Sequence, residues 1–253
     1  MSGAGPNRRS SGSKREAARL AAEQQARRRR ERKILLAFVA ALVLLVVGGG
    51  VGVQAWRTKR APSAGAPAVQ VTDAPQALVD GQPIRLGADS APAKIALYED
   101  FRCPHCADFE KEFGPVLTRA QNAGAAQIDL YPMAFVVPES SARAANAMGC
   151  ATVAGFGQRY YLGLFANPTL EWNDDQLLKL AGVVGGSATK EFSTCVTTGA
   201  KAGWVASVGV AAERNGVTAT PTLFLNGAPV PVAGLTPEKL QTMIDSATRA
   251  PAK

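Results

Sequence analysis

The segment Cys103-Pro104-His105-Cys106 holds two of the four cysteines and the one histidine of the chain. Two cysteines at this spacing can form a disulfide and exchange it with the thiols of another protein. The thiolate is the reactive form in such an exchange, so the surroundings of each sulfur decide its reactivity. The spacing therefore points to thiol–disulfide chemistry.

Two elements are expected to position this segment. An apolar run at 95–98 precedes it and predicts a buried strand. Apolar residues then recur at helical spacing and predict a helix with one buried face, which places Cys103 at the strand-to-helix junction. The apolar positions are Cys106, Phe109, Phe113 and Leu117, with Asp108, Glu110, Lys111 and Glu112 between them.

The start of a helix favours a negative charge, because its first N–H groups are unpaired and its dipole is positive there. We therefore expect the thiolate of Cys103 to be stabilised. Pro104 suits the first helical turn, where no N–H is needed. His105 would add a cation beside the sulfur when it is protonated.

Other uses of the cysteines make different demands on the sequence. A c-type haem site requires His directly after the second cysteine, where this chain has Ala107. A zinc site would need all four cysteines, with Cys150 and Cys195 as the further ligands. A purely structural role for Cys103 and Cys106 is a third alternative, although cysteines at a helix start are usually reactive. We expect no metal and no cofactor.

Cys-Pro-His-Cys after a buried strand resembles the active site of the DsbA family, the thioredoxin-fold thiol oxidants of the bacterial cell envelope. With the membrane anchor and second cysteine pair described below, the whole chain is most similar to the DsbA-like proteins of actinobacteria. The resemblance implies an α/β, thioredoxin-like fold with an inserted helical subdomain, preceded by a single transmembrane helix.

The basic charge of the chain is concentrated at its N-terminal end. Residues 1–33 hold eleven Lys and Arg against three acids, whereas residues 61–253 hold fourteen against seventeen. The body of the protein is therefore mildly acidic, which argues against a nucleic-acid partner.

Residues 34–53 form a run of twenty without a charge, long enough to cross a bilayer of about 30 Å as a helix. More Lys and Arg precede the run than follow it, so the N-terminus is expected in the cytoplasm and the body outside. The expected location is the cell membrane, with one span and an extracytoplasmic catalytic domain. A cleaved signal peptide ending near Ala55 is the alternative.

Four parts are expected along the chain. A basic cytoplasmic segment (1–33) and the anchor (34–53) lead into a flexible linker (54–77) rich in Ala, Pro, Ser and Gly. The DsbA-like domain is expected over 78–253. Within its first helix, Pro115 predicts an interruption or kink.

Helical patterns separated by breaks fill about 138–216, a stretch too long for one crossover. The arrangement agrees with the helical subdomain that the resemblance implies. Asn173 and Gln176 fit a capping pair at one helix start. The candidate helices are 141–155, 158–165, 174–180, 188–196 and 202–215.

Cys150 and Cys195 fall on two of these helices, 45 positions apart. In an oxidising compartment the simplest expectation is a structural disulfide, worth about 3–4 kcal/mol for such a loop. A second redox centre remains the alternative, although the pair lacks close spacing and a helix start.

The dipeptide Asn226-Gly227 predicts a hairpin that joins strands at 222–225 and 230–232. Just before it, the resemblance implies that Thr220 and Pro221 form a cis-proline loop facing the cysteines. We expect the backbone N–H and C=O of Thr220 to point outward, where an extended client could pair with them. A trans proline at the end of a loop is the alternative.

A buried acid six residues before the first cysteine assists proton movement in many thioredoxin-like proteins, but here that position is Leu97. Glu99 shares its face if the strand alternates, which makes Glu99 a candidate for proton transfer.

The sequence thus predicts an envelope thiol:disulfide oxidase that donates the Cys103–Cys106 disulfide to exported proteins with reduced cysteines. A client thiolate would attack Cys103, and Cys106 would be the inner thiol. The resemblance implies reoxidation by a quinone-linked membrane partner of the DsbB or VKOR type, and the anchor implies contact with the lipid bilayer. A reductase or isomerase on the same fold, or a non-catalytic thioredoxin-like binding module, are the alternatives.

Overall fold

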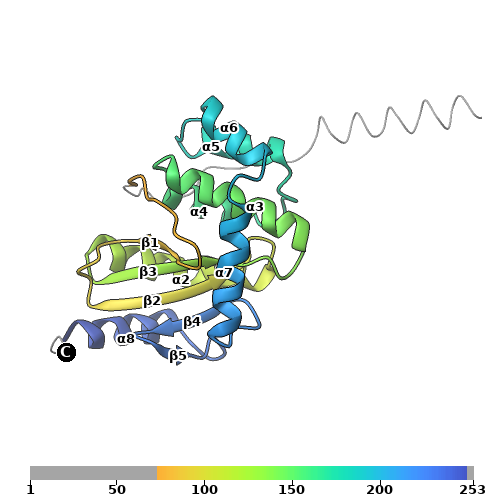
Figure 1. Ribbon diagram of the computed structural model, residues 1–253. Coiled ribbons are helices and arrows are strands. Elements are labelled where there is room, and N and C mark those ends of the chain that lie inside the picture. Colours follow the sequence, from red (N-terminus) through yellow and green to blue (C-terminus); the bar gives the residue numbers. More distant parts are fainter. Residues whose placement is uncertain (1–72, 250–253) are drawn as a thin grey trace, which may run out of the picture. The chain divides into compact units, whose positions relative to one another are not determined.

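A computed structural model describes residues 73–249 of the chain (Figure 1). The predicted basic segment 1–33, the anchor 34–53 and linker residues 54–72 lie outside the described residues, so these remain predictions. Within 73–249, no helix has the length and apolar character needed to cross a membrane.

The described residues form a mixed five-stranded sheet in the order β1-β3-β2-β4-β5. The central strands β2 and β3 are parallel, and the other neighbours pair antiparallel. The short strand β1 lies at one edge. The strands are β1 (Ile84–Leu86), β2 (Ala93–Glu99), β3 (Ala126–Pro132), β4 (Thr222–Leu225) and β5 (Ala228–Val230).

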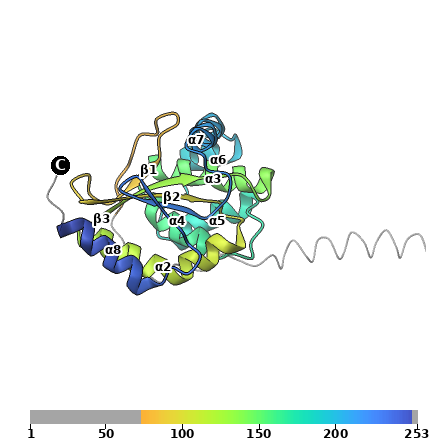
Figure 2. The same ribbon diagram turned by 90° about the horizontal axis from the view of Figure 1, so that it is seen from below.

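Helices cover both faces of the sheet. Helix α2 (Pro104–Asn122) and α8 (Pro237–Arg249) pack together on one face, and α7 (Ala202–Arg214) lies on the other (Figures 1 and 2). Helix α2 connects the parallel strands β2 and β3, so the end of β2 leads directly into the start of α2.

Four helices of the insert form a cluster of their own beside the sheet (Figure 1). They are α3 (Pro138–Val153), α4 (Gly157–Phe165), α5 (Asp174–Val183) and α6 (Lys190–Thr197). All the predicted helical segments are present, and Asn173 and Gln176 form the predicted capping box at the start of α5. Helix α4 also contacts α2, which brings the insert against the active-site helix.

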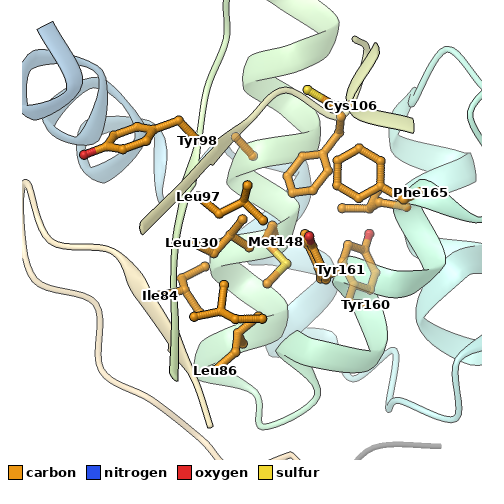
Figure 3. Packing of buried hydrophobic residues seen from close by; sticks show 14 of the residues in the cluster. Ile84, Leu86, Leu97, Tyr98, Cys106, Leu130, Met148, Tyr160, Tyr161 and Phe165 are labelled. Atoms are coloured by element: carbon orange, nitrogen blue, oxygen red, sulfur yellow. The ribbon is translucent and has the colours of Figure 1, made fainter. Parts of the chain in front are cut away.

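The core joins the sheet to the insert. Ile95 and Leu97 of β2 are fully buried, as the apolar run predicts. In Figure 3 the buried cluster continues from Leu97 through Met148 to Tyr160 and Tyr161. Cys106 lies at the upper end of this cluster, near Phe165.

Three expectations need correction. Helix α2 continues through Pro115 to Asn122 without the predicted interruption. Strand β5 begins at Ala228 rather than residue 230, because Asn226 and Gly227 both have positive φ and make a two-residue turn. Residues 73–77 belong to the folded part, since the Asp73 carboxylate accepts hydrogen bonds from the insert.

Candidate active site

The two motif cysteines lie where the central strand passes into α2. Cys103 is the N-cap residue, with Pro104 as the first residue of the helix. The Cys103 N–H donates to the Asp100 carbonyl at 2.9 Å, and its own carbonyl accepts from the N–H groups of Cys106 and Ala107 at 3.1 Å. These bonds fix the turn, and the Cys103 side chain lies at the positive end of the helix.

The two sulfurs differ in their access to solvent. Both cysteines are free thiols in this structure, so it represents the reduced form. Cys103 is 6% exposed, whereas Cys106 is completely buried. Pro104 and His105 between them are exposed. Only Cys103 is accessible to the thiol of another protein.

The loop before β4 faces Cys103. Its Thr220–Pro221 peptide bond is cis, in agreement with the expected cis-proline loop. The pairing of Tyr98 with Thr222 brings this loop to the end of β2, from which the cysteine motif starts. The Cys103 thiol donates to the Thr220 carbonyl oxygen at 3.5 Å. That carbonyl therefore faces the Cys103 thiol in the reduced form, and the pairing of the Thr220 backbone with an extended client stays a prediction.

The inner thiol is strongly disposed to keep its proton. Burial raises the pKa of Cys106 well above its ordinary value, and the nearby charge of Glu99 raises it further. The Asp100 backbone and the Thr220 side chain favour the thiolate but are outweighed. Once the disulfide opens, Cys106 therefore takes up a proton, and its return to a thiolate needs a nearby base.

Glu99, the predicted proton-transfer residue, is the acid close to Cys106. Its side chain is completely buried, and its Oε2 accepts a hydrogen bond from the Tyr161 hydroxyl at 2.7 Å. Its other oxygen, Oε1, has no hydrogen-bond partner. Burial raises the pKa of Glu99 well above its ordinary value, and the adjacent Glu110 adds to this effect. A carboxyl whose pKa is raised in this way is better suited to give and accept protons than an ordinary surface carboxyl.

Glu110 is a site residue that the sequence pattern misplaces. It was expected on the solvent face of α2, but it is only 8% exposed. Its carboxyl interacts with the hydroxyl of Tyr161 from α4, and burial raises its pKa to about 7. Its position four residues after Cys106 was a usable signal, since residues at that spacing share a helix face. No comparable pattern in the sequence indicated that Tyr161 would lie at the site.

Asp100 is a second residue whose role the sequence did not indicate. Its buried carboxylate accepts hydrogen bonds from the N–H of Arg102 at 2.8 Å and from those of Phe135 and Val136 at 2.8 and 2.9 Å. It thereby holds the loop after β3 against the cysteine turn. Because a buried carboxylate needs such partners, it fixes both segments in one arrangement.

An exposed apolar strip lies on the loop that Asp100 holds. Phe135, Val136 and Val137 are 38%, 45% and 40% exposed. Exposed apolar residues in contiguous groups mark surfaces for interaction with other molecules. This strip is adjacent to the cysteine turn through the hydrogen bonds of Asp100.

The second cysteine pair lies in the insert. Cys150 of α3 and Cys195 of α6 form a disulfide with a Cα–Cα distance of 6.0 Å. Their sulfurs bond to each other, so they are not available to complete a four-cysteine zinc site. No cluster of three or more potential metal-ligating side chains occurs among residues 73–249.

Comparisons with known proteins agree with this arrangement. A sequence model of the thioredoxin family matches residues 80–246. Reduced DsbG, a disulfide bond oxidoreductase from Mycobacterium tuberculosis, is 25% identical over 68% of this chain and 90% of its own, with a TM-score of 0.58. Oxidised DsbA from the same organism is 25% identical over 66% and 93%, with a TM-score of 0.57.

A further solved structure has the same fold at lower identity. MdbA, a thiol-disulfide oxidoreductase from Corynebacterium diphtheriae, is 21% identical over 71% of this chain and 95% of its own, with a TM-score of 0.57. No curated protein matches the sequence.

Proposed function

Since this chain belongs to the thioredoxin family, as a thiol-disulfide oxidoreductase of the DsbA type, we propose that it acts as an oxidase in the cell envelope. It would transfer the Cys103–Cys106 disulfide to exported proteins with reduced cysteines. The observation that carries the proposal is the contrast between the two sulfurs. Cys103 caps a helix start at the surface, and Cys106 is buried with a strongly raised pKa.

The first step opens the enzyme disulfide. A client thiolate attacks the Cys103 sulfur, the only one of the two that it can reach, and a mixed disulfide forms. The Cys103–Cys106 bond breaks, and Cys106 leaves with the electron pair. Because burial disfavours its charge, Cys106 takes up a proton, and this protonation drives the opening forward.

The second step releases the oxidised client. A second client thiolate attacks the client sulfur of the mixed disulfide, and Cys103 leaves as a thiolate. The helix start stabilises this leaving thiolate. The client dithiol is oxidised by two electrons, and the enzyme disulfide is reduced to a dithiol. An enzyme whose reduced form is stabilised in this way is a good oxidant.

Glu99 is the proposed partner of Cys106 in proton transfer. It donates the proton that Cys106 takes up when the disulfide opens and accepts that proton when the disulfide forms again. Its burial beside Cys106 and its unpartnered Oε1 support this role.

Clients would be held by backbone and apolar contacts. The exposed strip Phe135, Val136 and Val137 suits the apolar segments that incompletely folded proteins expose. Recycling of the reduced form would require a membrane-bound, quinone-linked reoxidant of the DsbB or VKOR type.

The proposed location rests on the sequence. The uncharged run 34–53 with its basic N-terminal flank supports an anchor with residues 61–253 outside the cytoplasm. Protease added to intact cells stripped of their wall should digest the body of the protein and spare residues 1–33. Protection of the body would exclude this topology.

The direction of exchange is tested with the full-length protein. Its disulfide is equilibrated with glutathione, and its oxidation of a reduced two-cysteine peptide is compared with its reduction of insulin. An oxidase should have a potential closer to about −120 mV than to about −270 mV and should oxidise the peptide faster. A potential near the lower value would assign the reductase function instead.

A further inference from the structure

Three buried side chains from three elements meet beneath the cysteines. Glu99 ends β2, Glu110 lies on α2, and Tyr161 lies on α4. The Tyr161 hydroxyl donates to Glu99 Oε2 at 2.7 Å and also interacts with the Glu110 carboxyl. One hydroxyl therefore connects two carboxyl groups. Figure 3 shows Tyr161 in the core below Cys106.

The far end of this connection opens to the surface between α2 and α4. Glu110 lines a cavity of about 500 Å³, whose walls include Pro115, Leu162 and Phe165. Its Oε1 is buried and has no hydrogen-bond partner. Glu110 is nevertheless 8% exposed and lines this cavity, so its carboxyl lies where the buried acids meet the solvent. Neither motif cysteine, His105 nor Pro221 lines the cavity.

We propose that Tyr161 and Glu110 carry protons between Glu99 and the solvent at the α2–α4 surface, so that Cys106 exchanges its proton while a client covers Cys103. The proposal requires only exchange at Cys103 and Cys106, in either direction. A client or a reoxidant bound over Cys103 closes the direct route to water, whereas the α2–α4 cavity is lined by neither the motif cysteines nor Pro221.

The local sequence leaves room for the Glu110 carboxyl. A Cβ atom on Gly114 would lie 2.8 Å from Glu110 Oε2, which is too close. Glycine is unfavourable inside a helix, so its presence here agrees with a need for space beside the carboxyl.

The charges around the three residues favour a single shared negative charge. The pKa of Glu99 is raised by burial and by the charges of Glu110 and Cys103, and it is lowered by the hydrogen bond from Tyr161. The pKa of Glu110 is raised by burial and lowered by its interaction with the Tyr161 hydroxyl. Burial and repulsion disfavour ionisation of both carboxyls together. Asp108 and Lys111 also line the cavity and face the water that would exchange with Glu110. The pKa of Glu110, raised by burial to about 7, suits proton exchange near neutral pH.

During closure of the Cys103–Cys106 disulfide, each proton and electron pair can be followed from donor to acceptor. Cys106 gives its proton to Glu99 Oε1, and its sulfur attacks the Cys103 sulfur of a mixed disulfide. The Cys103–Cys106 bond forms, and the partner sulfur leaves with the electron pair. The protonated Oε1 of Glu99 then turns towards Tyr161 and gives this proton to the Tyr161 oxygen. At the same time the Tyr161 hydroxyl passes its own proton to the Glu110 carboxylate. Glu110 then releases a proton to water in the cavity. Opening reverses these transfers.

The first test compares two neighbouring tyrosines. Tyr160 is buried on the same helix and donates to the Leu177 carbonyl at 2.8 Å, so Tyr160→Phe loses one buried hydrogen bond away from the acids. The reduced full-length protein is mixed with glutathione disulfide, and mixed-disulfide formation and closure are followed separately by rapid quenching. Tyr161→Phe should slow closure about 100-fold, the lower end of the range for single proton-transfer groups, and leave formation unchanged. Closure as fast as in Tyr160→Phe would overturn the proposal.

The second test uses Glu110→Gln, with the exposed Glu112→Gln on the same helix as the matched control. In the unaltered protein, the rate of disulfide closure plotted against pH should show an inflection near pH 7. Glu110→Gln should remove the inflection, and Glu112→Gln should keep it. An inflection that survives in Glu110→Gln would exclude Glu110 as the outlet. Because glutathione disulfide serves as the probe, both tests remain decisive even if the protein proves to be a reductase.

Discussion

The thiol of Cys103 donates a hydrogen bond to the carbonyl oxygen of Thr220 at 3.5 Å, across 117 positions of sequence. Pairing of β2 with β4 creates this contact, because it brings the loop before β4 to the start of α2. The contact needs the hydrogen of the reduced thiol. When Cys103 forms a mixed disulfide, the oxygen loses this donor and can accept the backbone N–H of a bound client.

The roles of the two cysteines can be separated by trapping. Cys106→Ser should accumulate mixed disulfides between Cys103 and client proteins, because no inner thiol remains to displace the client. Cys103→Ser should accumulate none and should lose oxidase activity, since Cys106 is completely buried. Non-reducing electrophoresis followed by mass spectrometry identifies the linked residue. Equal trapping by Cys103→Ser would contradict this assignment.

The apolar strip beside the site should matter for large clients only. Val136→Ser should lower the rate of oxidation of an unfolded, reduced protein several-fold by removing apolar contact area. The rate with a small dithiol should stay the same. Val210→Ser is the matched control, because Val210 is equally exposed, at 46%, and lies on α7. If both variants oxidise the unfolded protein equally well, the strip does not bind clients.

The disulfide between Cys150 and Cys195 is expected to stabilise the insert without taking part in exchange. Replacement of both by Ser should cost about 3–4 kcal/mol and lower the melting temperature by roughly 10 °C, as judged by circular dichroism. The rate of exchange at Cys103 should be unaffected below the new melting temperature. A shift in the redox potential of Cys103–Cys106 would instead indicate a second redox centre.

Stability should fall with rising pH because of Glu110. Its pKa rises from 4.5 to about 7 on folding, so between these values the folded protein binds more protons than the unfolded chain. The stabilisation is complete below about pH 4.5 and is lost as the pH rises towards 7. Glu110→Gln should remove a decline on the order of 3 kcal/mol from the stability profile measured with urea. Glu112→Gln, an exposed substitution, should keep the decline; its disappearance there too would rule out Glu110 as its source.

The local sequence was sufficient to predict the helices and strands and the thiol–disulfide chemistry of the cysteine motif. The apolar run of β2, the periodicity of α2 and the capping pair of α5 act over a few residues, so each could be found without knowledge of the rest of the chain. Cysteine spacing at a strand-to-helix junction likewise predicted Cys103 and Cys106 as the reactive pair, and the structure places both at the start of α2. Glu99 could be nominated only as a residue on the same strand face as Leu97.

Tertiary structure decided which side chains surround the cysteines. Glu110 looks like a surface residue in the helical pattern, and it is buried because α4 packs against α2 and brings Tyr161 over it. Asp100 becomes an anchor because the loop after β3 returns to it. Thr220 reaches Cys103 through the register of β2 and β4. Periodicity and spacing record only neighbours along the chain, whereas these contacts depend on the packing of elements far apart in sequence, and that packing also sets the desolvation that shifts the pKa values of the buried acids.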